Sequence, residues 1–174
     1  KLNDEGINAI PIDDVTKFPE MLDGRVKTLH PMVHGGLLYR RDLESHVNTV
    51  KEYGITPIDL VCVNLYEFEK ALKAGKPMAE MIENIDIGGP SMIRSAAKNF
   101  KDVLIVTNPA DYSSVLEALE NGTDDYNFRL NLAYKAFCMT AAYDSMISRY
   151  FAYIVNDEFP ETLKLSLKKV EHLR

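Results

Sequence analysis

Three short runs of apolar residues in the first two thirds of the chain have the length and composition of buried β-strands. They cover residues 9–12, 58–65 and 103–107. The second and third runs are almost continuously hydrophobic, which is typical of strands covered on both faces. Because helical patterns lie between and after these runs, we expect an α/β fold with a parallel, doubly covered sheet.

Residues that start or end helices bound these helical patterns. One pattern spans residues 42–53 and ends at Gly54, and another spans residues 76–83 with a proline in its first turn. A third begins with an Asn-Pro pair and ends with an Asn-Gly pair, over residues 108–122. Asparagine is a good helix cap and proline suits the first helical position, so we expect a helix there as well.

The pattern changes at about residue 125. Apolar and aromatic residues then recur at helical spacing over roughly seven turns, which is long for a globular helix. We expect a packing arm or a connector between domains. Residues 1–8 look like the end of a helix that stops at Gly6, and residues 163–174 form an amphipathic segment without a stop signal, so we expect a fragment. The apolar and aromatic residues that recur at helical spacing after residue 125, here called the helical stripe, are Phe128, Leu132, Ala136, Met139, Tyr143, Met146, Tyr150 and Tyr153.

Residues 84–98 place a carboxylate and a Gly-Gly pair just ahead of a predicted helix start. A Gly-Gly turn lets a ligand approach the backbone, and the unpaired N–H groups of the helix then point at it. This helix start is therefore a candidate oxyanion or phosphate site. Ser91, Arg94, Ser95 and Lys98 share one face of the helix, and the pattern alone favours a solvated basic face.

Two further polar clusters lie near predicted strand ends or turns. Arg25, Lys27 and Thr28 crowd into one short stretch, and two cations beside a hydroxyl suit a phosphate or carboxylate. Asn64 and Tyr66 leave the second predicted strand at its carboxyl end, where open α/β sheets bind ligands.

Composition and charge narrow the functional classes. The chain has 174 residues, a net charge of −6 and 46% hydrophobic residues, which is enough for one cored domain without a global attraction to nucleic acid or membranes. It carries no apparent signal peptide or membrane span, so the cytoplasm is the default location.

Cys62 and Cys138 lie in apolar runs, so we expect buried, reduced thiols. His30 and His34 lack a third ligand and are expected to be structural.

Several ordered motifs resemble inosine monophosphate (IMP) cyclohydrolase, the N-terminal domain of the bifunctional purine biosynthesis enzyme whose other half is AICAR formyltransferase. The resemblance implies a fold like methylglyoxal synthase, a homodimer, and ring closure of formyl-AICAR to IMP without metal or redox cofactor. The resemblance also divides the chain in two. Residues 1–124 are the expected cyclohydrolase domain, without its first strand and phosphate loop. Residues 125–174 are the expected helical connector toward a formyltransferase domain. The motifs are Gly24–Pro31 with His34–Leu37, Val63–Tyr66, Ile85–Gly89 with Arg94–Asn99, and Lys135–Phe137 with Thr140, Tyr143 and Asp144.

The same resemblance implies roles for individual residues. Lys98 is the expected proton donor and acceptor, and Lys27 lies near the reacting carboxamide; two converging lysines would lower each other's pKa. Tyr66 and Asp86 complete the proton network, with Asp86 holding a lysine charged or orienting the carboxamide; from sequence alone, Asp86 could instead cap the helix. The expected substrate-binding groups are Arg25, Thr28, Asn64 and Arg94 and the backbone N–H groups of Ile87, Gly88 and Gly89.

Two positions depart from the family pattern, and two other functions stay open. Glu67 stands where the family has proline, and Met139 stands where it commonly has histidine. One alternative is methylglyoxal synthase, whose catalytic aspartate context is not evident here. The other is a non-catalytic phosphate-ligand module like the regulatory domain of carbamoyl phosphate synthetase, but binding alone would not require both lysines, Tyr66 and Asp86. Without the phosphate loop, we expect the fragment to bind substrate weakly.

Overall fold

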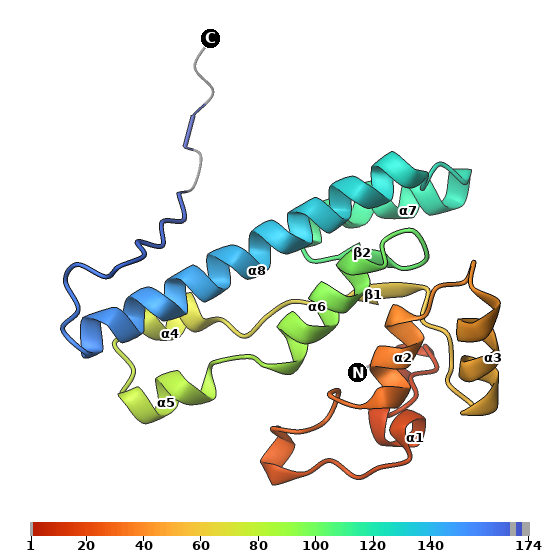
Figure 1. Cartoon of the computed structure of the whole chain (residues 1–174), viewed down its shortest axis with the longest axis horizontal. Coiled ribbons are helices and arrows are strands. Elements are labelled where there is room, and N and C mark those ends of the chain that lie inside the picture. The colour runs from red at the N-terminus through yellow and green to blue at the C-terminus, as the bar shows by residue number, and fades with distance from the viewer. Residues whose placement is uncertain (1, 168–169, 172–174) are drawn as a thin grey trace.

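A two-stranded parallel sheet lies at the centre of the fold, and helices surround it (Figure 1). The computed structural model describes residues 2–167 and 170–171. The elements, in chain order, are the 3-10 helix η1 (Asn3–Glu5), α1 (Ile12–Thr16), η2 (Leu22–Gly24), α2 (Pro31–Leu38), α3 (Glu44–Glu52), β1 (Leu60–Cys62), α4 (Phe68–Lys73), α5 (Met78–Glu83), α6 (Gly88–Lys98), β2 (Leu104–Val106), η3 (Pro109–Asp111), α7 (Tyr112–Asn121) and α8 (Tyr126–Ile154).

The sheet confirms the predicted parallel pairing but not the predicted cover on both faces. Leu60 of β1 pairs with Leu104 of β2, and the register continues to the third residue of each strand. All of β2 is buried, whereas in β1 only Val61 is buried and Leu60 is 41% exposed. The apolar run predicted the strand correctly but could not show that the side chains of Leu60 and Cys62 stay exposed in this chain.

The core lies between α6, α8 and the sheet. Ile93, Ala96 and Ala97 of α6 are at most 2% exposed and belong to the same cluster as Leu132 and Ala136 of α8. Small residues on both helices allow the two backbones to approach closely, which favours tight packing. These residues form the inward face of α6.

One predicted strand is wrong, and three helices were not predicted. Residues 9–12 form no strand; Pro11 offers no N–H to a sheet, and Ile12 instead begins α1. Helices α1, α2 and α4 were not predicted. In α2 the pair Gly35-Gly36 weakens the helical signal, but a Cβ on Gly36 would lie 2.4 Å from the carbonyl oxygen of Thr56, so close packing requires glycine there.

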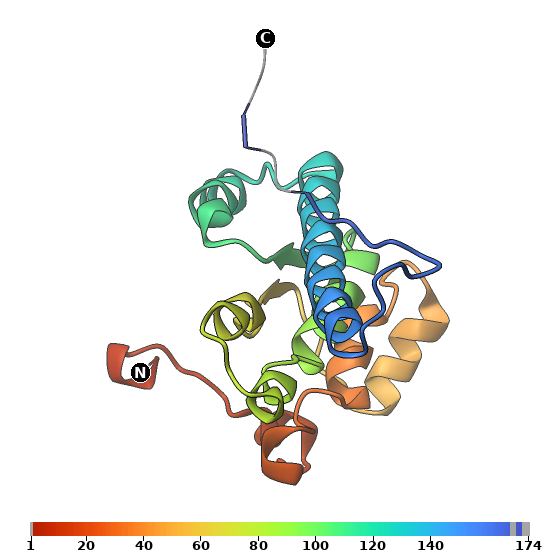
Figure 2. The same cartoon turned by 90° about the vertical axis from the view of Figure 1, so that its left-hand side faces the viewer.

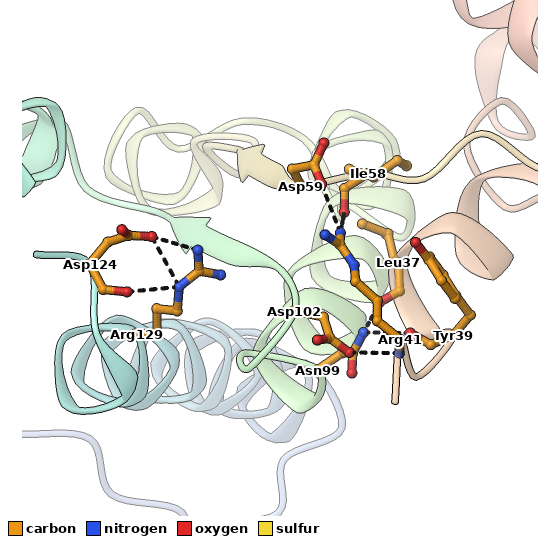
Figure 3. Close-up of polar contacts among 9 residues, drawn as sticks. All are labelled: Leu37, Tyr39, Arg41, Ile58, Asp59, Asn99, Asp102, Asp124 and Arg129. Atoms are coloured by element: carbon orange, nitrogen blue, oxygen red, sulfur yellow. Dashed lines mark hydrogen bonds and ion pairs between the residues drawn. The ribbon is translucent and has the colours of Figure 1, made fainter. Parts of the chain in front are cut away.

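Polar contacts tie the end of α2 to the end of α6 and to the start of β1 (Figure 3). The side-chain amide of Asn99 donates to the carbonyl oxygens of Leu37 and Tyr39, at 2.9 and 3.0 Å. The Arg41 guanidinium pairs with Asp59 at 2.9 Å. The two hydrogen bonds from Asn99 satisfy carbonyl groups that the end of α2 would otherwise leave unpaired.

Helix α8 runs along the whole molecule, as the two views show (Figures 1 and 2). It has 29 residues, and the side chain of Asp125 caps it by accepting a hydrogen bond from the N–H of Phe128 at 2.9 Å. The predicted long helix is thus confirmed. Residues 155–167 form no helix, and the rest of the predicted amphipathic segment lies partly outside the described residues.

Two observations concern the surface. Both cysteines, Cys62 and Cys138, are free thiols, as predicted, but both are exposed rather than buried. Within residues 2–167 and 170–171, no helix is both long and apolar enough to cross a membrane.

Candidate active site

A cavity of about 660 Å³ lies where the end of β1, the start of α6 and the turn before α2 meet. Its walls include nine of the eleven residues that sequence reasoning proposed for the site. These positions are up to 64 residues apart in sequence, and the fold brings them together. The nine are Arg25, Lys27, Thr28, Asn64, Tyr66, Asp86, Ile87, Gly88 and Gly89.

The start of α6 is built by close contacts that only glycine allows. A Cβ on Gly88 would lie 2.6 Å from the hydroxyl oxygen of Thr28, and one on Gly89 would lie 2.7 Å from both Asp86 Oδ2 and Leu65 Cδ2. Such distances are sterically excluded, so the Gly-Gly pair lets the hydroxyl and the carboxylate approach the helix end.

The carboxylate of Asp86 caps α6. Its Oδ1 atom accepts a hydrogen bond from the N–H of Gly89 at 2.8 Å, and its Oδ2 atom lies 3.4 Å from the N–H of Tyr66. The helix-cap interpretation of Asp86 is therefore confirmed. Capping does not remove Asp86 from the cavity, because the residue also lines the cavity wall.

Two of the three backbone donors predicted for an oxyanion are available. Because Gly89 donates to Asp86, its N–H group is engaged. The N–H groups of Ile87 and Gly88 make no hydrogen bond within the part of the chain that the structure describes. The positive end of the α6 dipole favours an anion beside these two groups.

The two basic side chains that line the cavity, Arg25 and Lys27, each form an ion pair with a glutamate. Arg25 forms an ion pair with Glu83 at the end of α5, and both side chains are 61% exposed. Lys27 Nζ lies 2.7 Å from a carboxylate oxygen of Glu20. The hydrogen bond to Glu20 raises the pKa of Lys27, so the expected lowering of that pKa by a second lysine is wrong for the single chain.

A tyrosine of α8 holds the loop that carries Asp86. The hydroxyl of Tyr143 accepts a hydrogen bond from the backbone N–H of Asp86 at 2.9 Å and donates to the carbonyl oxygen of Asn84 at 3.0 Å. Sequence reasoning named Tyr143 in the helical stripe and in the connector motif but gave it no role in the site. It also missed Glu20 and Glu83, because no local pattern shows which distant cation a carboxylate will meet.

The structure places Lys98 and Arg94 outside the cavity. Ten residues separate Lys98 from Gly88 along α6, a rise of about 15 Å. Both cations border a second, more open cavity of about 580 Å³ between α6 and α8, here called the α6–α8 groove. The guanidinium of Arg94 lies 5.7 Å from the centre of the Phe137 ring. Within the described part of the single chain, Lys98 and Lys27 border different cavities, so their convergence in one site stays a prediction.

The two histidines beside the site have structural contacts, as expected. His30 Nδ1 accepts a hydrogen bond from the N–H of Met32 at 3.2 Å and so caps α2. His34 Nδ1 lies 3.0 Å from the hydroxyl oxygen of Ser95, which joins α2 to α6. Burial lowers the pKa of His34. Among the described residues, no three His, Cys, Asp or Glu side chains gather closely enough to hold a metal ion.

Comparison with known proteins gives matches over both halves of the chain. Residues 1–91 match the model of the MGS-like domain, and residues 96–174 match that of the AICARFT/IMPCHase bienzyme. The boundary between the two models falls within α6. Helix α8 thus belongs to the bienzyme match, whereas Asp86 and the glycine pair belong to the MGS-like match.

Relatives with high sequence identity are bifunctional purine biosynthesis proteins PurH. That of Clostridioides difficile (strain 630) is 57% identical over 173 residues, which are 99% of this chain and 34% of the relative. That of Oceanobacillus iheyensis is 55% identical over 170 residues, 97% of this chain and 33% of the relative. The chain thus spans about a third of the length of the curated relatives it matches.

A solved structure agrees with the fold. The crystal structure of ForH superposes with a TM-score of 0.74 at 40% sequence identity, covering 87% of this chain and 79% of that one. The expected fold like methylglyoxal synthase is confirmed by this likeness together with the match over residues 1–91. Because that match covers more than half of the 174 residues, the chain belongs to the family of MGS-like domains.

Proposed function

We propose that the chain catalyses, as part of a purine biosynthesis enzyme, the dehydrative ring closure of formyl-AICAR to IMP. One observation carries the proposal: a single cavity gathers nine predicted site residues in a chain that is 57% identical to a bifunctional purine biosynthesis protein. The cavity joins cations for a nucleotide phosphate to backbone donors for an oxyanion.

The reaction joins two groups of one molecule. The carboxamide nitrogen attacks the formyl carbon, the formyl oxygen takes up a proton, and the resulting carbinolamine loses water as the C=N bond forms. The protein's task is to hold the reactive rotamer, stabilise the developing oxyanion and move protons. The free N–H groups of Ile87 and Gly88 suit the oxyanion, and Arg25 with Thr28 suits the phosphate.

Lys27 and Asp86 are the proposed polar groups nearest the chemistry, with Tyr66 beside them. Lys27 is held charged by Glu20 in the absence of substrate, so it enters the reaction as a proton donor. A substrate that displaces Glu20 removes the carboxylate that raises the pKa of Lys27. The displacement thereby makes proton release easier.

We propose that Lys98 reaches the chemistry from a second copy of the chain, in a homodimer. Lys98 makes no ion pair within the described residues and borders a groove lined by Tyr134 and Phe137, which are 65% and 40% exposed. An exposed apolar groove that carries cations suits an interface. The expected partners are therefore a purine nucleotide and a second copy, and the expected location is the cytoplasm, with which two free thiols are compatible.

The test is ultraviolet monitoring of purine ring closure with formyl-AICAR, comparing the chain with its Lys98→Ala variant. We expect closure by the chain and a loss of roughly 100-fold or more in kcat in the variant. Equal rates in both proteins would remove Lys98 from the mechanism.

A chain without activity is tested in an extended form, because the chain spans only about a third of the length of its curated relatives. The extension is the N-terminal segment of the Clostridioides difficile relative. Closure by the extended chain would support the proposal, and no closure by either form would refute it. Light scattering on the same samples measures the mass, and a monomer at assay concentrations would refute the dimer.

A further inference from the structure

Tyr143 is a buried side chain of α8 that makes polar contacts with the loop before α6. Its side chain is 8% exposed, and its ring meets Phe68 of α4 edge to face, with 6.3 Å between the ring centres. Its hydroxyl lies between two backbone groups, the N–H of Asp86 and the carbonyl of Asn84. A buried apolar ring thus holds a polar group at one fixed point beside the cavity.

The loop between α5 and α6 depends on this hydroxyl. Residues 84–87 form neither helix nor strand, and within the described residues the N–H of Asp86 and the carbonyl of Asn84 have no hydrogen-bond partner other than Tyr143. A buried backbone group without a hydrogen bond is costly, and one hydroxyl satisfies a donor and an acceptor here. Burial raises the pKa of Tyr143, so the phenol keeps the proton that it donates to Asn84.

The position of the Asp86 backbone fixes the position of its carboxylate. That carboxylate reaches the N–H of Gly89 at 2.8 Å and faces the N–H of Tyr66. A chain of contacts therefore runs from α8 through Tyr143 to Asp86, and from Asp86 to the start of α6. The contacts connect the region of the bienzyme match to the glycine pair of the MGS-like match.

We propose that Tyr143 is a positioning residue for ring closure, which holds the backbone of residues 84–86 so that the Asp86 carboxylate and the start of α6 keep their places in the cavity. The inference rests on the proposed function for the reaction, but its structural part concerns the loop alone. It makes α8 a necessary part of the site rather than a connector only.

The first test measures backbone amide exchange in the ligand-free chain. In Tyr143→Phe, which keeps the ring and removes the hydroxyl, we expect exchange at Asp86 to accelerate roughly tenfold. We expect exchange at Gly89 to accelerate as well, although Tyr143 does not touch Gly89. The matched control is Tyr150→Phe, because the Tyr150 ring also packs on Phe68, at 5.7 Å, and its hydroxyl makes no hydrogen bond within the described residues.

The second test is a double-mutant cycle on ring closure. Tyr143→Phe is expected to lower kcat about tenfold with KM changed less than about twofold, because the residue acts on the reacting end and not on the phosphate. In an Asp86→Ala background the same change is expected to lower kcat by less than about twofold, since Tyr143 acts through Asp86. A residue that only stabilises the fold would lower kcat equally in both backgrounds.

Each outcome decides a different point. Faster exchange at Asp86 and Gly89 in Tyr143→Phe alone supports the proposal, and exchange equal to that of Tyr150→Phe overturns it. Equal losses of kcat in both backgrounds also overturn it. If no form of the protein closes the ring, the proposed function fails, while the exchange measurement still decides whether Tyr143 positions the loop.

Discussion

The amino end of α6 opens into a polar cavity, whereas the carboxyl half of the same helix borders an apolar groove shared with α8. At the amino end, residues from four segments meet, and the hydroxyl oxygen of Thr28 lies only 2.6 Å from the point that a Cβ of residue 88 would occupy. At the carboxyl half, Lys98 and Arg94 stand among exposed apolar side chains.

This difference separates what one chain can build from what it cannot. The cavity gathers within one chain the groups that we propose for phosphate and oxyanion binding. The groove displays Lys98, a cation that the proposed chemistry requires, about 15 Å along α6 from Gly88. The difference supports the proposal that one end of α6 serves its own site and the other serves the site of a second copy.

The largest expected effect concerns the groove. Tyr134→Asp places a charge on the exposed apolar surface of α8, and we expect it to raise the dissociation constant of the dimer about 100-fold. Analytical ultracentrifugation measures this constant. The affinity of the cavity for inorganic phosphate, measured by calorimetry, should not change. An unchanged dissociation constant of the dimer would show that the α6–α8 groove is not the interface.

The next effect concerns the cavity. Gly88→Ala brings a methyl group against the hydroxyl of Thr28, and we expect about tenfold weaker binding of IMP together with a destabilisation of about 1 kcal/mol. Calorimetry and urea unfolding measure the two quantities. The companion variant Thr28→Ala removes the opposing oxygen, so Gly88→Ala should weaken binding less in that background. Equal losses in both backgrounds would show that the close contact with Thr28 is not the reason for glycine.

A smaller effect is expected from the ion pair at the mouth of the cavity. Glu83→Gln frees Arg25, and we expect inorganic phosphate to bind about two- to fivefold more tightly at low salt. The matched control is Glu80→Gln, because Glu80 lies on the same helix as Glu83 and pairs with Lys76, which precedes that helix, but does not line the cavity. Phosphate affinity equal in the two variants would contradict the competition between Glu83 and phosphate.

The smallest effect lies between the two ends of α6, where His34 meets Ser95. Burial lowers the pKa of His34, so the unfolded chain takes up a proton more readily than the folded chain. The free energy of unfolding is therefore highest above the ordinary histidine pKa of about 6.5, and this contribution is lost as pH falls through that value toward the lower folded pKa. Urea unfolding at pH 7.5 and 5.5 should show a smaller loss in His34→Gln than in the wild type. An equal loss would exclude His34 as a source.

Local sequence signals were sufficient where a contact is short in sequence. The Asn-Pro pair predicted a helix start, and Asn108 caps the 3-10 helix η3 that leads into α7. The predicted end at Gly122 is likewise confirmed. The glycine pair at the start of α6 likewise predicted a close approach, and Asp86, three residues before Gly89, is its cap.

Contacts between distant segments could not be predicted in the same way. Arg25 meets Glu83 across 58 positions, and Tyr143 meets Asp86 across 57. An apolar run also does not reveal which of its side chains stay exposed to solvent in a single chain. For this reason Cys62 was expected to be buried, whereas it is exposed. The position of Lys98 could not be predicted for a related reason, since the resemblance named the residue but the geometry of α6 decides which cavity it borders in the single chain.

Complementation between two variants tests the central claim most directly. Lys27→Ala and Lys98→Ala chains, co-expressed with different tags, form mixed dimers in which one site carries both changes and the other carries neither. Each variant alone should be inactive in ring closure, and a random mixture should recover about a quarter of the wild-type rate. A mixture no more active than either variant would contradict a site shared between two copies.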